Sequence, residues 1–269
     1  MFELVLIFRK RADGGRCVMT TTDRALPDSG IEPALEVYFL GRIDFDEAMR
    51  LQRRLVYEVG ESGLAAMILC EHDPVISVGR SGSRAHIKPD DEQLRAMSLK
   101  TRWVNRGGGC VLHVPGQLGV YFALPLDRLG IGVRGLIDGL HDSLIATLAD
   151  FDVPGKRIDG RPGVFVGEER IASIGIAIDR WIAYHGLTLN IGAYLPFFRI
   201  LDEPGPFSGG LRQTSMEAIR RRPAHQPAVR ETLVRKIEER FSLKTHYIYT
   251  SHPSLARRVR PGALYAEAR

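Results

Sequence analysis

The chain has 269 residues, of which 44% are hydrophobic and 26% are charged, and its net charge is +5 at pH 7. This composition is typical of a globular protein with one large or two small domains. No apolar run approaches the roughly 20 residues of a membrane span. The three cysteines form no C-x-x-C pair that would indicate a zinc site or a disulfide framework.

The 37 basic and 32 acidic residues are interspersed along the chain. A mildly positive surface fits an acidic protein partner better than a groove for nucleic acid, and a merely soluble surface explains it at least as well. We therefore expect neither a nucleic-acid nor a membrane partner.

Residues 1–33 are expected to form an irregular N-terminal extension, because residues 9–33 are rich in Arg, Gly, Thr, Asp and Pro and show little periodicity. Within Met1–Phe8 an acidic residue comes early and basic residues follow later, the reverse of a secretory signal peptide. We therefore expect a cytoplasmic protein. The folded domain is expected over residues 34–250, with a C-terminal tail over residues 251–269.

The first elements of that domain are a strand and a helix. A strand is predicted at Leu35–Leu40, and helical spacing of apolar residues predicts a helix over residues 45–59. Asp44 and Glu47 resemble a capping box at the start of this helix, and Gly63 ends it.

The remainder of the domain alternates between strands and helices. Apolar stripes predict helices at Arg134–Phe151 and Val229–Phe241. Further strands are predicted at Leu64–Cys70, within Glu71–Arg80, and at Leu118–Leu126, Gly163–Val166, Arg170–Ile178, Ile182–Ile191 and Thr245–Tyr249. Clustered strands with a few helices between them predict an α+β fold of one domain.

Arg106–Gln117, which reads R-G-G-G-C-V-L-H-V-P-G-Q, is the most informative stretch of the chain. Three successive glycines remove the Cβ atoms that would keep a ligand from the backbone, and they permit conformations that expose several N–H groups. Arg106 adds a planar cationic fork and His113 a titratable ring. The Pro-Gly turn then leads into an apolar run, so the stretch predicts a site for a ligand with a polar end and an apolar tail.

Four blocks in this order resemble the lipoate/octanoate transferase and ligase superfamily, which also contains biotin protein ligases. The blocks are Glu71–Arg80 (E-H-D-P-V-I-S-V-G-R), Arg106–Tyr121 (R-G-G … H-V-P-G-Q-L … Y), Pro162–Gly175 (P-G-V-F-V-G … I-A-S-I-G) and His185–Asn190 (H-G-L-T-L-N). The lipoyl(octanoyl) transferase branch is the most similar. The resemblance covers roughly residues 35–220, and four ordered blocks are far more specific than any one of them.

The resemblance implies a single α+β domain with a mixed β-sheet and flanking helices. It also implies an octanoyltransferase, which moves octanoyl from acyl carrier protein to a lysine of a lipoyl domain in 2-oxoacid dehydrogenase or glycine cleavage proteins. No cofactor or metal is implied. The substrate-binding residues would be Arg106, Gly107, Gly108, Gly109, His113, Ser173, Ile174, Gly175, His185, Gly186 and Leu187.

Two other functions are compatible with the same blocks. The protein could be a catalytically degenerate member that binds an acyl or lipoyl group without transferring it. It could also be an ATP-dependent lipoate ligase, because Gly107–His113 resembles the G-G-G-A-V-x-H pattern of the ligase branch.

The chain departs from the family at two catalytic positions. Members use a cysteine nucleophile in a P-C-G turn and a lysine just before I-A-S-I-G. Here the lysine position holds Arg170, which keeps the positive charge but cannot give up a proton at neutral pH. The turn contains Glu203, Pro204 and Pro206 where the cysteine would fall, so the nucleophile is unknown.

Three other side chains are alternatives for the nucleophile. Ser208 and Ser215 lie near the turn, but no activating base is evident close to them. Cys110 lies in the glycine motif. If the motif is a strand, Cys110 points away from the face of His113 and packs in the core. A kink at the glycines would reverse this, and Cys110 would then be a candidate nucleophile.

Overall fold

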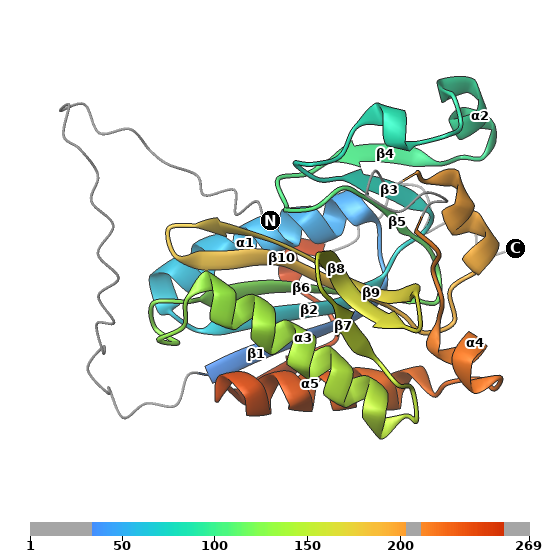
Figure 1. Cartoon of the computed structure of the whole chain (residues 1–269). Helices are drawn as coiled ribbons and strands as arrows, with labels where there is room; N and C mark the ends of the chain where they lie inside the picture. Colours follow the sequence, from blue (N-terminus) through green and yellow to red (C-terminus); the bar gives the residue numbers. More distant parts are fainter. Residues whose placement is uncertain (1–33, 203–210, 256–269) are drawn as a thin grey trace, which may run out of the picture.

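The computed structural model describes residues 34–202 and 211–255, which fold into helices and strands as Figure 1 shows. The strands are β1 (Ala34–Arg42), β2 (Ala65–Glu71), β3 (Val75–Val78), β4 (Lys100–Trp103), β5 (Cys110–His113), β6 (Gln117–Pro125), β7 (Lys156–Ile158), β8 (Arg161–Val166), β9 (Glu169–Asp179), β10 (Ile182–Asn190) and β11 (Lys244–Tyr249). The α-helices are α1 (Phe45–Ser62), α2 (Asp91–Ala96), α3 (Val133–Asp150), α4 (Met216–Arg220) and α5 (Gln226–Phe241). Short 3₁₀ helices lie at η1 (Arg84–His86), η2 (Leu195–Ile200) and η3 (Pro253–Leu255).

The described strands form two sheets. The larger has eight strands in the order β11-β1-β2-β6-β10-β9-β8-β7. Strand β1 runs parallel to β2 and β11, and the other neighbours pair antiparallel, so the predicted mixed sheet is confirmed. A second sheet of three strands, β4-β3-β5, was not predicted from the sequence.

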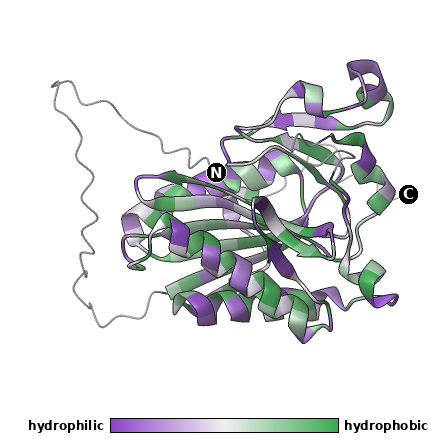
Figure 2. Ribbon diagram, viewed as in Figure 1, coloured by the Kyte–Doolittle hydropathy of each residue, from purple (hydrophilic) through white to green (hydrophobic). Residues whose placement is uncertain are grey.

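The large sheet is buried on both faces. Along β2, Ala65, Met67 and Leu69 belong to the apolar cluster that includes α3 and α5, whereas the alternate residues belong to a cluster with α1. Because both faces are covered, the strand reads as a continuous apolar run and not as an alternating one. Figure 2 shows apolar residues concentrated in this sheet and hydrophilic residues in patches along α3 and α5.

The ends of α1 differ in part from the prediction. The Asp44 carboxylate accepts bonds from the backbone N–H groups of Asp46 at 2.9 Å and Glu47 at 3.2 Å. The Glu47 side chain does not return the bond that would complete a capping box; it lies 3.7 Å from Arg50 instead. The helix runs three residues past Val59, to Ser62, and ends at Gly63 in the left-handed conformation with φ 75°.

The other predicted elements are present, with ends shifted by a few residues, and several short elements were missed. The largest shift is in α5, which begins at Gln226 and not at Val229. The missed elements include α2, α4, β4 and β7. Each has six residues or fewer, too short to show a hydrophobic period.

The predicted extension over residues 1–33 lies outside the described residues. The same holds for residues 256–269 of the predicted tail.

Candidate functional site

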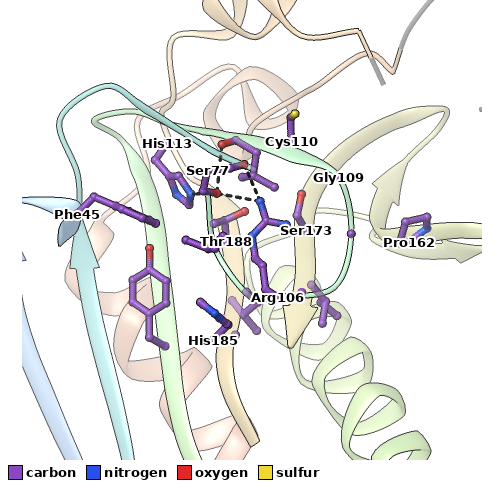
Figure 3. A pocket seen from close by; sticks show the side chains of 18 of the residues that line it. Phe45, Ser77, Arg106, Gly109, Cys110, His113, Pro162, Ser173, His185 and Thr188 are labelled. Carbon is purple, nitrogen blue, oxygen red and sulfur yellow. Dashed lines mark hydrogen bonds between the residues drawn. The ribbon is translucent and has the colours of Figure 1, made fainter. Parts of the chain in front are cut away.

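A pocket lies where the small sheet meets strands β9 and β10 of the large one (Figure 3). Most of the expected binding residues line it: Arg106, Gly108, Gly109, His113, Ser173, Ile174, Gly175, His185, Gly186 and Leu187. Gly107 lies beside the pocket, and its N–H donates to the Ile176 carbonyl at 2.9 Å. These residues come from three of the four blocks, and Ser77 of the remaining block, Glu71–Arg80, lines the same pocket.

The glycine segment, residues 106–109, connects the two sheets. On one side its carbonyls accept backbone bonds from residues 79–81, with N···O distances of 2.9 to 3.1 Å. On the other side the segment lies close against β9. A Cβ atom on Gly175 would lie 2.8 Å from the Gly107 carbonyl oxygen, so glycine at position 175 permits this approach.

Arg106 is buried at the polar end of the pocket, with 8% of its surface exposed. Its Nη2 donates to both the carbonyl and the hydroxyl oxygen of Ser77 at 2.8 Å, and its Nη1 donates to the Gly107 carbonyl at 3.0 Å. The guanidinium therefore holds the glycine segment against β3 and places a fixed positive charge beside the cavity.

Ser77 also contacts His113, and the sequence analysis did not single it out. Its Oγ lies 2.8 Å from His113 Nε2, and Figure 3 shows the chain of bonds from Arg106 through Ser77 to His113. One sequence signal could have identified Ser77. It is the lone hydroxyl in the otherwise apolar strand Val75–Val78, and a buried polar group needs a hydrogen-bond partner.

Burial lowers the pKa of His113 well below its usual value, and His72 and Arg106 lower it further. The imidazole is therefore neutral near pH 7, and its Nδ1 is buried without a hydrogen-bond partner among the described residues. The titratable ring expected from the sequence is thus held in one protonation state.

His185 is neutral for a similar reason. It is 6% exposed, and burial lowers its pKa to about 4, with further contributions from Arg106, Arg80 and Arg53. Its backbone is left-handed, with φ 60°, and the next residue is Gly186. A Cβ on Gly186 would lie 2.0 Å from the Val120 carbonyl oxygen, so the motif H-G reflects close packing against β6.

The lowered pKa of His185 predicts a loss of stability in mild acid. Between pH 6.5 and about 4 the unfolded chain binds a proton that the folded chain does not, so stability is complete above this window and falls as the pH drops through it. The shift corresponds to about 3 kcal/mol. Denaturant unfolding at pH 7.5 and pH 5 should show about 2 kcal/mol of this loss, because pH 5 lies about 1.5 units into the window.

His185→Asn provides the comparison, because asparagine tolerates positive φ and does not titrate. The variant should show a smaller drop in unfolding free energy between the two pH values. An unchanged drop would show that His185 is not responsible, and would leave His72 and His113, whose pKa values burial also lowers.

Arg170, at the lysine position of the family, lines the pocket and is 5% exposed. Its backbone N–H donates to the Arg212 carbonyl at 2.9 Å, and its carbonyl accepts from Thr214 N–H at 2.9 Å. In the amide orientation that satisfies both side chains, Gln213 accepts from Nη2 of Arg170 at 2.8 Å and from Nε at 3.1 Å. The guanidinium is thus held in place by the segment at residues 212–214.

The candidate nucleophiles fall in different places. Glu203, Pro204, Pro206 and Ser208 lie outside the described residues. Ser215 is 3% exposed, and its Oγ accepts from the Ala218 N–H at the start of α4, so it caps a helix.

Cys110 is 1% exposed and belongs to the apolar cluster that contains Ile76 and Leu112. Its Sγ lies 3.6 Å from the Ser83 carbonyl oxygen, and Figure 3 shows the sulfur pointing away from Arg106 and His113. The residue borders the pocket, but its thiol faces the core of the small sheet, as the strand alternation predicts.

Two negative findings apply to residues 34–202 and 211–255. No group of three or more His, Cys, Asp or Glu side chains is arranged there to hold a metal ion. No helix within these residues is both long and apolar enough to cross a membrane.

Comparison with known proteins identifies relatives of this chain. An octanoyltransferase of Syntrophobacter fumaroxidans is 36% identical over 183 residues, which cover 68% of this chain and 78% of that protein. An octanoyltransferase of Geotalea uraniireducens is 35% identical over 185 residues, or 68% of this chain and 82% of that protein. These relatives confirm the expected octanoyltransferase type of acyltransferase.

Solved structures confirm the fold. A lipoate-protein ligase A bound with ATP superposes with a TM-score of 0.67 and 13% identity, over 84% of this chain and 92% of that one. A bipartite lipoate protein ligase from Thermoplasma acidophilum gives a TM-score of 0.63 and 14% identity, over 83% and 89% of the two chains. Residues 44–238 match the lipoyl protein ligase A/B catalytic domain, and the chain therefore belongs to that family.

Proposed function

We propose that this protein transfers octanoyl from a carrier-bound thioester to the amine of a lysine in a lipoyl domain, by direct attack of that amine. The convergence of residues from all four matched blocks on one pocket carries the proposal, in a chain whose relatives include octanoyltransferases. The pocket combines an apolar wall, which suits an acyl chain, with the fixed charges of Arg106 and Arg170 at its polar positions.

The lysine nitrogen attacks the thioester carbonyl carbon. The C–N bond forms, the C–S bond breaks, and the proton that the amine loses ends on the departing sulfur. The developing oxyanion lies against the backbone N–H groups of Gly108 and Gly109 and is stabilised by the nearby cationic side chains. Arg170 acts as a fixed charge and not as a proton carrier, because a guanidinium stays protonated at neutral pH.

Positioning supplies most of the rate in this scheme. A bound thioester and a docked lysine react as if in one molecule, which lowers the barrier without an activated enzyme nucleophile. The amine attacks in its neutral form, and the neutral imidazoles of His113 and His185 add no positive charge to those of Arg106 and Arg170.

The experiment is to incubate the protein with octanoyl-acyl carrier protein and an apo lipoyl domain and to follow the mass of the domain. Gain of octanoyl without ATP is the expected result. Gain only from free octanoate with ATP would identify a ligase, and no gain under either condition would leave a protein that binds without transfer. Incubation with the donor alone tests direct attack, because an enzyme-bound octanoyl group in the intact mass would contradict it.

Cys110→Ala is expected to retain octanoyl transfer within about twofold of the parent. The thiol packs in the core, and in the proposed mechanism it forms no bond to the octanoyl group. Cys70→Ala is the matched control, since Cys70 is also a buried thiol and lies outside the pocket lining. A loss of at least 100-fold in Cys110→Ala alone would make Cys110 the nucleophile.

A further inference from the structure

Arg80 lies next to the glycine segment. Its backbone N–H donates to the Arg106 carbonyl at 2.9 Å, within the paired stretch 79–81. Its side chain is exposed, and its Nη2 lies 3.9 Å from the position that a Cβ on Gly107 would take. The guanidinium therefore lies directly beside the segment that borders the pocket.

Arg53 lies on α1, on a turn that is bonded to the strand of His185. The preceding residue, Gln52, donates from Nε2 to the carbonyls of Phe122 at 3.1 Å and His185 at 3.2 Å, which fixes this turn of α1 against β6 and β10. Arg53 is exposed on that turn. The charges of Arg53 and Arg80 both lower the pKa of His185, and Arg80 lies beside Gly107.

Neither of these two arginines forms an ion pair with a described residue, whereas their neighbours are paired. Arg54 contacts Glu58, and Arg84 lies 2.9 Å from Asp91. Two uncompensated cations close to one pocket favour an anionic ligand group there, since an arginine fork matches the oxygens of a phosphate.

We propose that Arg80 and Arg53 bind the phosphate of a phosphopantetheine arm whose octanoyl thioester occupies the pocket. The proposal rests on the proposed function, because it assigns the part of the thioester donor that remains outside the acyl cavity. The acyl end enters between β5, β9 and β10, and the arm leaves past the glycine segment, beside which Arg80 lies. The same phosphate chemistry is present in a carrier protein and in coenzyme A.

The test compares three donors: octanoyl-acyl carrier protein, octanoyl-coenzyme A and octanoyl-N-acetylcysteamine, which lacks the phosphate. Arg80→Gln and Arg53→Gln, alone and together, should lower the preference for either phosphate-bearing donor over the N-acetylcysteamine thioester, expressed as a ratio of kcat/KM. The expected fall is roughly tenfold for each arginine, as for loss of a charge-assisted hydrogen bond. Arg54→Gln removes the same charge from the same helix and should leave the ratio unchanged.

Two outcomes would overturn the assignment. An equal loss with all three donors would mean that the arginines maintain the pocket itself. A loss restricted to the carrier-protein donor would mean that they contact protein carboxylates and not the phosphate.

Binding measured by calorimetry separates this proposal from the proposed function, because it requires no transfer. The parent protein should bind phosphopantetheine more tightly than pantetheine, and the double variant should bind the two alike. If transfer fails but the parent protein still binds phosphopantetheine more tightly than pantetheine, the phosphate site is supported and the proposed transferase mechanism is wrong. If the parent protein binds the two compounds equally, the phosphate site is wrong even where transfer succeeds.

Discussion

Arg106→Met is expected to reduce octanoyl transfer by at least about 100-fold and to lower the free energy of unfolding by about 2–4 kcal/mol. Methionine has a similar length but leaves the carbonyls of Ser77 and Gly107 without their donor. Each buried polar group without a partner costs about 1–3 kcal/mol. Release of the glycine segment then misplaces the thioester, and displacement by about 1 Å can cost 100-fold in rate.

The measurements are kcat/KM for transfer and denaturant unfolding of the same preparations. Arg106→Lys should give values of kcat/KM and unfolding free energy between those of the parent and the methionine variant. Lysine keeps the positive charge but lacks the planar guanidinium with its several donors. Arg84→Met is the control: it also removes backbone bonds, to the Ile87 and Pro89 carbonyls, but outside the pocket lining. Equal losses of activity in Arg84→Met and Arg106→Met would show that stability alone accounts for the effect.

Gly175→Ala is expected to lower transfer by at least about tenfold. The added Cβ would lie 2.8 Å from the Gly107 carbonyl oxygen and 3.2 Å from Arg106 Cδ. Neither neighbour can yield easily, because Gly107 is bonded to β9 and Arg106 is bonded to Ser77. The glycine segment must therefore move off the strand, with an overpacking cost of about 1–3 kcal/mol.

Gly109→Ala in the same segment serves as the stability control. Its Cβ would meet no atom within 4 Å, so its unfolding midpoint should match that of the parent. If both variants unfolded at the parental midpoint, the close approach of Gly175 to the segment would not be a constraint.

The sequence predicted the large elements and the order of the site blocks. The 18-residue helices α1 and α3 and the long strands of the main sheet have enough residues for their hydrophobic pattern to stand out. The small sheet was missed because β4 is a four-residue edge strand with mostly polar residues, and the other two strands of this sheet are equally short. This sheet forms by pairing between residues 25 or more positions apart, and a local sequence pattern does not show such pairing.

At the site itself, the sequence identified the residues that line the pocket but not what they bond to. Strand alternation alone placed the Cys110 thiol in the core and the His113 ring on the opposite face, because that property is local to the strand. The lone hydroxyl of Ser77 indicated that it needs a partner, but which partners could not be predicted, since Arg106 and His113 lie 29 and 36 positions away. The resemblance to the family came from residue types in order, and it needed no contact to be recognised.

The sequence by itself thus determined the fold class, the family and the glycine segment with its arginine and histidine. Only the tertiary structure decided the electrostatics of the site. His113 and His185 are neutral because burial removes water from their rings, and the Arg106 charge points at the cavity because Ser77 and Gly107 hold its guanidinium. Burial and hydrogen bonding depend on segments brought together from distant parts of the chain, so these properties exist only in the folded protein.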